Sequence, residues 1–392
     1  MDSHFITWVE YLLRFSHLVA GIYWIGSSFY FIWLDSSFEP PEKPQKNTDG
    51  ELFMVHGGFY YQVLKKKFYP GELPKTLHWF KWEATITWIT GIFLFFLMYY
   101  LNGAGLMLSA KLNPTMTQFQ VIAMSLSIII LSWLVYDFIW LPRFEKFKFV
   151  SLFISVFLFF GIVFLNTYMF SGRGAYILTG VIMGTMMVLN VWVRILPGQR
   201  KMLAQAESGQ IPDYSLGLKA KSRSIHNTYF TFPVLLIMIS NHYAFLYNSE
   251  NNGLFLILLA LSGAFIRHAM VAREKAYRWL YVIGFGILFY LFYISAPKTQ
   301  TMILSDKNPV PEYSQIKGIF QTHCLSCHSS QNTDKIFTVA PKNFILETEE
   351  QIKLNAASIY QRVWVDRNMP FNNQTQITEA EREAIARFTK KL

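Results

Sequence analysis

The chain has 392 residues, of which 52% are hydrophobic, 17% aromatic and only 15% charged. A soluble domain normally carries about 25% charged residues, so this composition excludes a single large soluble domain. The net charge of +10 is compatible with nucleic-acid binding, but basic loops on a membrane protein explain it more simply. We therefore expect a lipid bilayer as a partner and no nucleic acid.

Apolar runs of about 20 residues occupy most of the chain up to residue 296. Each run is long enough to cross a bilayer core of about 30 Å as an α-helix. The first run has no basic segment before it and is longer than a signal peptide, so we expect no cleavable signal. Eight spans are predicted, at residues 6–34, 84–102, 119–141, 149–170, 174–195, 225–247, 254–272 and 279–296.

The loops between the predicted spans differ strongly in charge. The loops joining spans 1–2, 3–4, 5–6 and 7–8 hold 18 Lys and Arg residues, whereas the others hold only Lys111 and Arg173. Cytoplasmic loops are the ones rich in Lys and Arg. The pattern predicts a multi-pass membrane protein with both termini on the side away from the cytoplasm.

The last quarter of the chain is polar and charge-rich. We predict a membrane domain at residues 1–298, a linker at 299–313 and a separate small domain at 314–392. The segment SQIKGIFQTHC before the two cysteines and the C-terminal TEAEREAIARFTKKL are both typical of helices. Because both cysteines lie in one motif, a disulfide framework is not expected.

The motif CLSCH at residues 324–328 is typical of covalent haem attachment. The thiols of Cys324 and Cys327 can bond the two vinyl groups, while the imidazole of His328 reaches the iron. Met369, in RNMPF, is the expected sixth ligand, since a thioether opposite histidine raises the potential and suits electron transfer. A zinc site would need two more ligands, and a redox dithiol would need a βαβ setting. His323 is expected to be a solvated surface histidine.

These patterns predict an all-α fold class. The expected architecture is a polytopic membrane helix bundle of about eight spans, followed by a small class I-like cytochrome c domain. One covalent haem c is the expected cofactor, with His328 and Met369 as the iron ligands. Such haems are joined to their motifs on the outer side of a bacterial inner membrane. The loop charges place this region on that side independently.

Ionisable residues inside membrane spans are costly to bury and point to functional sites. Towards the outer side lie Arg14, His17, Asn241 and His242. Paired histidines on different spans can ligate a b-type haem, and His17 with His242 is the candidate pair. A lone intramembrane histidine is more often a hydrogen-bonded packing residue, and both interpretations stay open.

A second group of polar residues lies towards the predicted cytoplasmic side. Arginines, asparagines and histidines together suit a planar, anionic substrate, because Arg binds such groups in bidentate fashion. A simpler interpretation is that Asp137 pairs with Arg194. The candidate substrate-site residues in this group are Arg194, His226, Asn227, Arg267 and His268, with Asp137 and Asn190 beside them.

Several long stretches resemble the bacterial membrane-bound urate oxidases (the urate hydroxylase PuuD family), which join an eight-span domain to a C-terminal cytochrome c. The most specific is SIHNTYFTFPVLLIMISNHY at residues 224–243, whereas CLSCH alone is shared by many cytochromes. The other similar stretches lie at residues 16–31, 78–88, 172–199 and 355–378. The similar stretches are therefore spread along the chain from residue 16 to residue 378.

The resemblance implies a cytochrome c-linked urate oxidase. Such an enzyme oxidises urate to 5-hydroxyisourate and passes the electrons to its own c-type haem, not to oxygen as peroxide. Urate and a downstream electron acceptor, either a soluble cytochrome or a terminal oxidase, are the implied partners. Urate oxidation releases two electrons and one haem accepts one at a time, so the steps are sequential or a second cofactor is present.

Two other functions remain open at this stage. The chain could be a quinol-linked electron-transfer subunit that delivers electrons to a terminal oxidase. It could also be a transporter or sensor whose cytochrome reports the redox state. Reduction of the haem by urate separates the first function from both alternatives.

Overall fold

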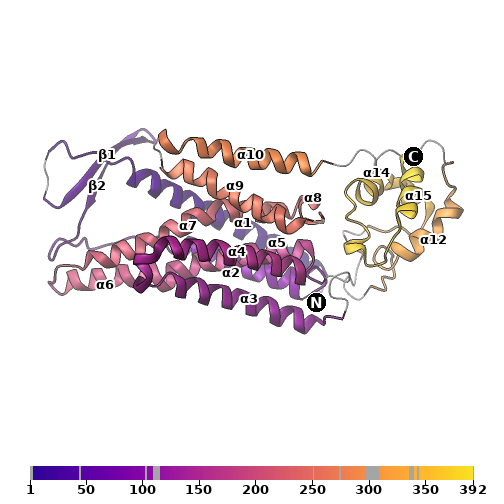
Figure 1. Ribbon diagram of the computed structural model, residues 1–392, viewed down its shortest axis with the longest axis horizontal. Helices are drawn as coiled ribbons and strands as arrows, with labels where there is room; N and C mark the ends of the chain where they lie inside the picture. Colours follow the sequence, from indigo (N-terminus) through magenta and orange to yellow (C-terminus); the bar gives the residue numbers. More distant parts are fainter. Residues whose placement is uncertain are drawn as a thin grey trace.

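The computed structural model describes residues 3–43, 46–101, 104–108, 115–249, 251–272, 275–296, 309–334, 340–341 and 344–391. A bundle of long helices forms the body of the molecule (Figure 1). A β-hairpin projects from one end of the bundle, and a small unit of short helices lies at the other end. The N-terminus lies at the end that carries this small unit, so both ends of the chain are on the same side of the bundle.

A helix occurs at each of the eight predicted spans. Two of them contain a π-helical segment, Phe96–Tyr100 after α2 and Asn190–Ile195 between α5 and α6. The helices of the bundle are α1 (Ser3–Asp35), α2 (Trp82–Phe95), α3 (Gln118–Ile139), α4 (Lys148–Met169), α5 (Gly172–Leu189), α6 (Leu196–Glu207), α7 (Tyr214–Ser240), α9 (Asn252–Ala272) and α10 (Trp279–Ile294). Short helices between them are Pro142–Phe147, α8 (Ala244–Tyr247) and Lys275–Tyr277.

Six helices in the described part of the chain are long and apolar enough to cross a membrane: α1, α2, α3, α4, α5 with α6, and α9. The protein is therefore a helical membrane protein. The helix α7 differs because its first turns carry the polar sequence SLGLKAKSRS. The helix α10 has 16 residues, which is about 24 Å at 1.5 Å per residue and shorter than a bilayer core.

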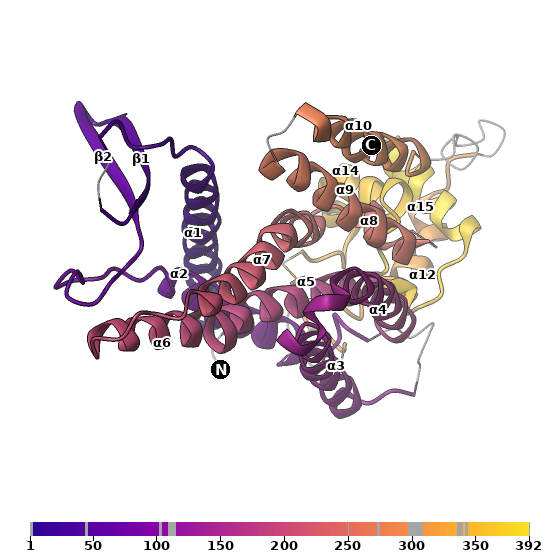
Figure 2. The ribbon, with the colours of Figure 1, turned by 60° about the vertical axis from the view of Figure 1, so that its left-hand side comes forward.

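Residues 48–66 form a β-hairpin, which the predicted all-α fold class did not include. Strands β1 (Thr48–His56) and β2 (Phe59–Lys66) pair in antiparallel fashion. Gly57 and Gly58 make the connection with φ of 59° and 82°, and this two-residue turn favours glycine because both residues have positive φ. Figure 2 shows the hairpin projecting beyond the end of α1.

The helix α5 lies at the centre of the membrane bundle. Thirteen of its 18 residues are buried, including Tyr176 and Leu178, which are fully buried. Its neighbours α3, α4, α7 and α9 contribute the remaining core residues, such as Val163, Ile237 and Leu256. Because α5 is apolar on all sides, it is a core helix that the other helices surround.

The C-terminal unit has a hydrophobic core of its own, formed by Ile316, Phe320, Ile352, Ile359 and Ile385 with their neighbours. Its elements are α12 (Tyr313–His323), α13 (Glu349–Leu354), α14 (Ala356–Tyr360), the π-helical segment Gln361–Val365, the turn Phe371–Asn373 and α15 (Glu379–Lys390). The predicted linker at 299–313 lies mostly outside the described residues, and α12 begins at Tyr313.

Candidate functional site: a cavity between the membrane bundle and the C-terminal unit

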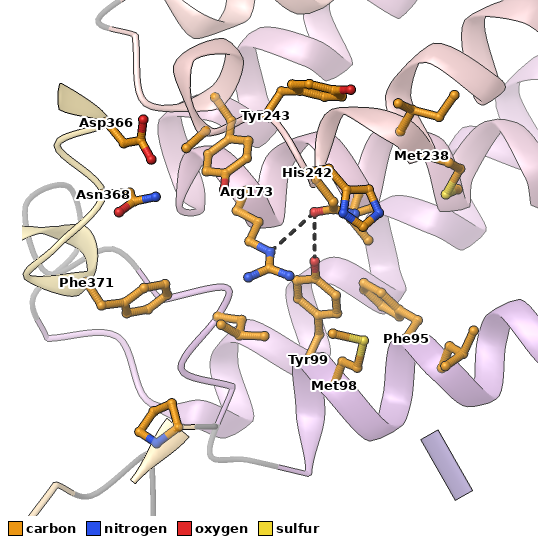
Figure 3. A pocket seen from close by; sticks show the side chains of 18 of the residues that line it. Phe95, Met98, Tyr99, Arg173, Met238, His242, Tyr243, Asp366, Asn368 and Phe371 are labelled. Carbon is orange, nitrogen blue, oxygen red and sulfur yellow. Dashed lines mark hydrogen bonds between the residues drawn. The ribbon is translucent and has the colours of Figure 1, made fainter. Parts of the chain in front are cut away.

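One cavity of about 1420 Å³ extends from the interior of the membrane bundle into the C-terminal unit. Its membrane part is lined by α1, α2, α5 and α7, and its other part is lined by the residues around the CLSCH motif. Figure 3 shows the junction, where Asp366, Asn368 and Phe371 of the C-terminal unit lie opposite Arg173 and Tyr243 of the bundle. All six predicted haem-binding residues line this cavity: Cys324, Cys327, His328, Met369, His17 and His242.

The two cysteines follow directly after α12. The backbone N–H of Cys324 donates to the carbonyl of Phe320, and that of His328 donates to the carbonyl of Cys324 at 2.8 Å. This tight turn brings both thiols and the imidazole to one wall of the cavity. Burial raises the pKa of the Cys324 thiol to about 12 and that of the Cys327 thiol to about 11. Both thiols are therefore neutral at pH 7.

The imidazole of His328 is fixed by a hydrogen bond. Its Nδ1 lies 2.7 Å from the backbone carbonyl of Phe344, which can only accept, so Nδ1 carries the proton. Burial lowers the pKa of His328, so the ring is neutral at pH 7. The Nε2 atom is then a free lone pair, and a histidine held through its other nitrogen in this way is typical of a metal ligand.

A buried arginine binds the backbone of the loop that carries Met369. Nη1 of Arg382, a residue on α15 that is 5% exposed, donates to the carbonyls of Met369 at 2.6 Å and Val363 at 2.9 Å. These bonds fix the backbone on which the thioether sits. Close by, Trp364 Nε1 and Asn368 Oδ1 are buried polar atoms without a hydrogen-bond partner.

The residues of this wall fit a c-type haem. Two neutral thiols, a neutral imidazole with a free Nε2 and a thioether line one apolar cavity. Asn368 also lines it, and its unpaired Oδ1 is a polar atom that a bound molecule can satisfy. In the described part of the chain, no three His, Cys, Asp or Glu residues cluster in a way that would hold a metal ion directly. A zinc site is therefore not supported here.

The prediction for His323 was wrong. This side chain is 8% exposed, and its Nδ1 lies 2.8 Å from the hydroxyl of Thr375. Its Nε2 lies 3.4 Å from the carboxylate of Glu381 on α15. The residue faces inward because α12 and α15 pack together, and it joins α12 to the segment between Met369 and α15.

In the membrane part of the cavity, His17 on α1 is held in the same manner as His328. Its Nδ1 lies 2.8 Å from the carbonyl of Thr87 and 3.3 Å from the hydroxyl of Thr90, both on α2. Gly91 allows this close approach, since a Cβ at that position would lie 2.8 Å from Cε1 of His17. The side chain of His242, at the end of α7, is exposed and lines the cavity.

Polar residues surround the junction between the two parts of the cavity. Arg173, in the first turn of α5, donates through Nε to Asn241 Oδ1 at 3.3 Å, and Tyr99 donates to the same oxygen at 3.3 Å (Figure 3). Arg14 on α1 also lines the cavity and pairs with Glu10 at 2.8 Å. Two guanidinium groups therefore lie near the point where the bundle meets the C-terminal unit.

The predicted pair of Asp137 and Arg194 is confirmed. Both oxygens of the Asp137 carboxylate accept from Arg194, with 2.7 Å between Nε and Oδ1. A second arginine also binds there. Nη2 of Arg223, 5% exposed on α7, lies 3.0 Å from Asp137 Oδ1 and 2.9 Å from the carbonyl of Trp140.

A hydrogen-bond network continues from this ion pair into the bundle. The hydroxyl of Tyr136 lies 2.7 Å from Nδ1 of His226. The amide of Asn190 donates both to that hydroxyl and to Oδ1 of Asn227, each at 2.9 Å. Arg223 Nη1, 3.5 Å from Asn190 Oδ1, links this network to the ion pair. Arg194, His226 and Asn227 therefore lie in one network, and Tyr136 and Arg223 are members that the sequence did not indicate.

Replacing Asp137 with asparagine is expected to destabilise the protein strongly. The change leaves two guanidinium groups, one of them deeply buried, without a compensating charge. Breaking a buried ion pair in this way costs about 3–5 kcal/mol. Thermal unfolding of the purified variant in detergent measures the effect, with Asp213→Asn on the exposed loop before α7 as a control. A melting temperature equal to that of the wild type would contradict the structural role of the pair.

Arg267 and His268 belong to a different group from Arg194, on the other side of α7. The guanidinium of Arg267, a residue that is 3% exposed, stacks over the ring of Phe29 at 3.7 Å. Its Nε and Nη2 are buried without a hydrogen-bond partner. Nδ1 of His268 lies 2.6 Å from the hydroxyl of Tyr229. The five predicted substrate-site residues thus form two clusters.

Of the arginines in these two clusters, Arg194 and Arg223 both pair with the single carboxylate of Asp137, whereas no carboxylate among the described residues forms a salt bridge with Arg267. A buried cation with unpaired donors is costly unless an anion binds it. The phenol of Tyr229, the imidazole of His268 and the flat faces of Phe29 and Phe232 lie in the same cluster. This cluster has the chemistry to hold a planar anion.

Comparison with known families gives one match. The family model described as "Urate oxidase N-terminal" matches residues 3–297, which is the whole membrane bundle. No match was found among curated proteins or among solved structures.

Proposed function

The chain belongs to the urate oxidase N-terminal family, and on this premise we propose that it is a membrane-bound oxidoreductase that converts urate to 5-hydroxyisourate. In the proposed reaction, urate and water give 5-hydroxyisourate, two protons and two electrons, so the oxygen comes from water and no peroxide forms. The electrons go to a c-type haem in the C-terminal unit. The observation that carries this proposal is the cavity that the family domain shares with the CLSCH wall.

Four residues of the C-terminal unit would hold the haem. Cys324 and Cys327 would form the two thioether links, and His328 Nε2 and the sulfur of Met369 would bind the iron. A haem with these ligands supplies a one-electron acceptor of raised potential. The protein keeps His328 neutral and oriented through the carbonyl of Phe344, and Arg382 holds the loop of Met369 in place.

Urate would bind at the cluster around Arg267. Urate is a planar anion with several carbonyl and N–H groups, and a guanidinium with two unpaired donors matches such a group in bidentate fashion. Phe29 and Phe232 supply flat apolar faces. His268, hydrogen-bonded to Tyr229, is the nearest base for the protons that the reaction releases, and the network of His226, Asn227 and Arg194 lies on the other side of α7.

Isolated membranes provide the direct test of this function. Urate is expected to reduce the c-type haem, seen as the appearance of the ferrous absorption bands, while a quinol is not. Reduction by quinol with no response to urate would instead support an electron-transfer subunit. A haem that responds to neither would favour a transporter or sensor.

The variant Met369→Ala is expected to retain covalent haem with a lower midpoint potential. The thioether favours ferrous iron, so its removal favours the ferric state. A redox titration of the purified protein measures the shift, with Met54→Ala in the hairpin as a matched methionine control. An unchanged midpoint in Met369→Ala would assign the sixth ligand to another residue.

We also propose that the C-terminal unit lies in the periplasm of a bacterial inner membrane, where it would meet a soluble cytochrome or a terminal oxidase. The basic loops and the hairpin lie at the opposite end of the bundle. A reporter active only in the periplasm is expected to be active when fused after residue 392 and silent when inserted within residues 200–220. The reverse pattern would overturn this orientation.

A further inference from the structure

The membrane part of the cavity has an open space beside α5. Four glycines line it, Gly21 on α1, Gly91 on α2, and Gly180 and Gly184 on α5, and side chains of His17 and Met238 pack closely against Gly91 and Gly180. A Cβ on Gly184 would meet no atom within 4 Å, so the space in front of this residue is open. Other lining residues are apolar, among them Trp24, Ile177 and Leu235. The result is a broad apolar slot in the outer half of the bundle.

Two histidines from different helices line the same slot. His17 has its Nδ1 bound to the carbonyl of Thr87 at 2.8 Å, which leaves the Nε2 lone pair free as a ligand. His242 makes no side-chain hydrogen bond to the described residues, and its imidazole is exposed to the cavity. A histidine that only packs in a membrane satisfies its polar atoms internally, whereas each of these rings retains a nitrogen available for a ligand.

Two cations lie at the outer end of the slot. Arg14 and Arg173 both line the cavity; Arg173 contacts Asn241, and Arg14 pairs with Glu10 at 2.8 Å, so a propionate would bind Arg14 beside or in place of that carboxylate. Arginine binds carboxylates in bidentate fashion. The slot therefore combines a flat apolar interior, two imidazoles and two carboxylate-binding groups at its mouth.

From this geometry we infer that the membrane bundle binds a non-covalent, b-type haem, with His17 and His242 as iron ligands and with Arg14 and Arg173 binding its two propionates. A quinone lacks both the carboxylates and the metal that this set of residues would serve. The inference deepens the proposed function, because one urate releases two electrons. The two haems would each accept one of these electrons, and the downstream acceptor would remove them one at a time.

The proposed b-type haem and the proposed c-type haem would share one cavity. It continues without interruption to Cys324, Cys327 and His328, so the two haems would lie on either side of the junction drawn in Figure 3. The aromatic side chains of Tyr99 and Tyr243 lie at this junction.

The test measures haem content and does not depend on urate. Acidic acetone should extract haem from purified full-length protein in an amount equal to the covalent haem that remains. Gly184→Phe is expected to remove the extractable haem while covalent haem staining persists, because a Cβ at this position meets no atom within 4 Å and the new ring would extend into the cavity. Gly161→Phe on the exposed face of α4, where a Cβ also meets nothing within 4 Å, is the matched control and should retain it.

The ligands are tested in the same way. His17→Ala and His242→Ala should each lose the extractable haem and the b-type band of the reduced spectrum, while His4→Ala on the same helix as His17 should keep both. Wild-type protein that yields no extractable haem, or yields a quinone instead, would overturn the inference even if urate reduces the c-type haem. Extractable haem in a protein that does not respond to urate would contradict the proposed function alone.

Discussion

The double variant Cys324→Ser with Cys327→Ser is expected to lose all covalent haem, because each thiol forms one of the two thioether links. Denaturing gels of membranes, stained for haem and probed for the protein, give the ratio of haem to chain. Ser326→Ala, which changes the residue between the cysteines and leaves both thiols in place, should keep the wild-type ratio. Full staining of the double variant would show that the motif does not attach haem.

The variant Arg267→Leu is expected to lose urate-dependent haem reduction. Losing one partner of a buried, hydrogen-bonded charge pair costs on the order of 2–5 kcal/mol, which corresponds to a roughly 30-fold or larger rise in the urate concentration needed. The conservative variant Arg267→Lys keeps the charge without the bidentate geometry and should fall in between. Initial rates of haem reduction over a range of urate concentrations measure this series.

A second measurement separates substrate binding from a structural role for Arg267. The wild-type guanidinium holds two buried donors without partners, and replacing it with leucine removes them. The melting temperature of Arg267→Leu in the absence of urate should therefore be no lower than that of the wild type. A variant that melts much earlier and still responds to urate with wild-type affinity would show that Arg267 serves the fold only.

Hydrophobicity alone was sufficient to predict where the membrane helices lie, because a helix that crosses the bilayer core needs about 20 consecutive, mainly apolar residues. It did not indicate the hairpin, although its sequence carries a recognisable signal. Gly57 and Gly58 stand between two runs that are rich in aromatic and β-branched residues, which is typical of a two-residue turn. The hairpin was missed because its neighbours, with proline and lysine, suggested a plain loop.

Charged side chains were harder to place than helices. The pairing of Asp137 with Arg194 was predictable because an unpaired charge inside a membrane span is costly, and opposite charges there usually form a pair. The contact between Arg223 and Asp137 was not predictable, because the polar sequence before residue 225 suggested a loop. In the structure α7 begins earlier, at Tyr214, and the carboxylate of Asp213 caps its first turn. Tyr136 and Tyr229 were missed since a tyrosine that faces lipid and one that binds a histidine have the same local sequence pattern.

The proposed haem-binding residues Cys324, Cys327 and His328 form a compact motif, so their chemistry could be inferred from spacing. The sequence could not indicate that the carbonyl of Phe344 orients His328 or that the carbonyl of Thr87 orients His17. Backbone carbonyls have no side-chain signature, and only the packing of the chain brings them to these rings. The open face of Gly184 is likewise a property of the assembled bundle.

The central claim is that electrons move from urate to the c-type haem within this one chain. The most direct measurement is the absorption spectrum of the purified full-length protein, recorded without oxygen before and after urate is added. We expect the oxidised haem to convert to its ferrous spectrum, with 5-hydroxyisourate appearing and no peroxide formed. A haem that stays oxidised in excess urate, yet is reduced at once by dithionite, would contradict this account.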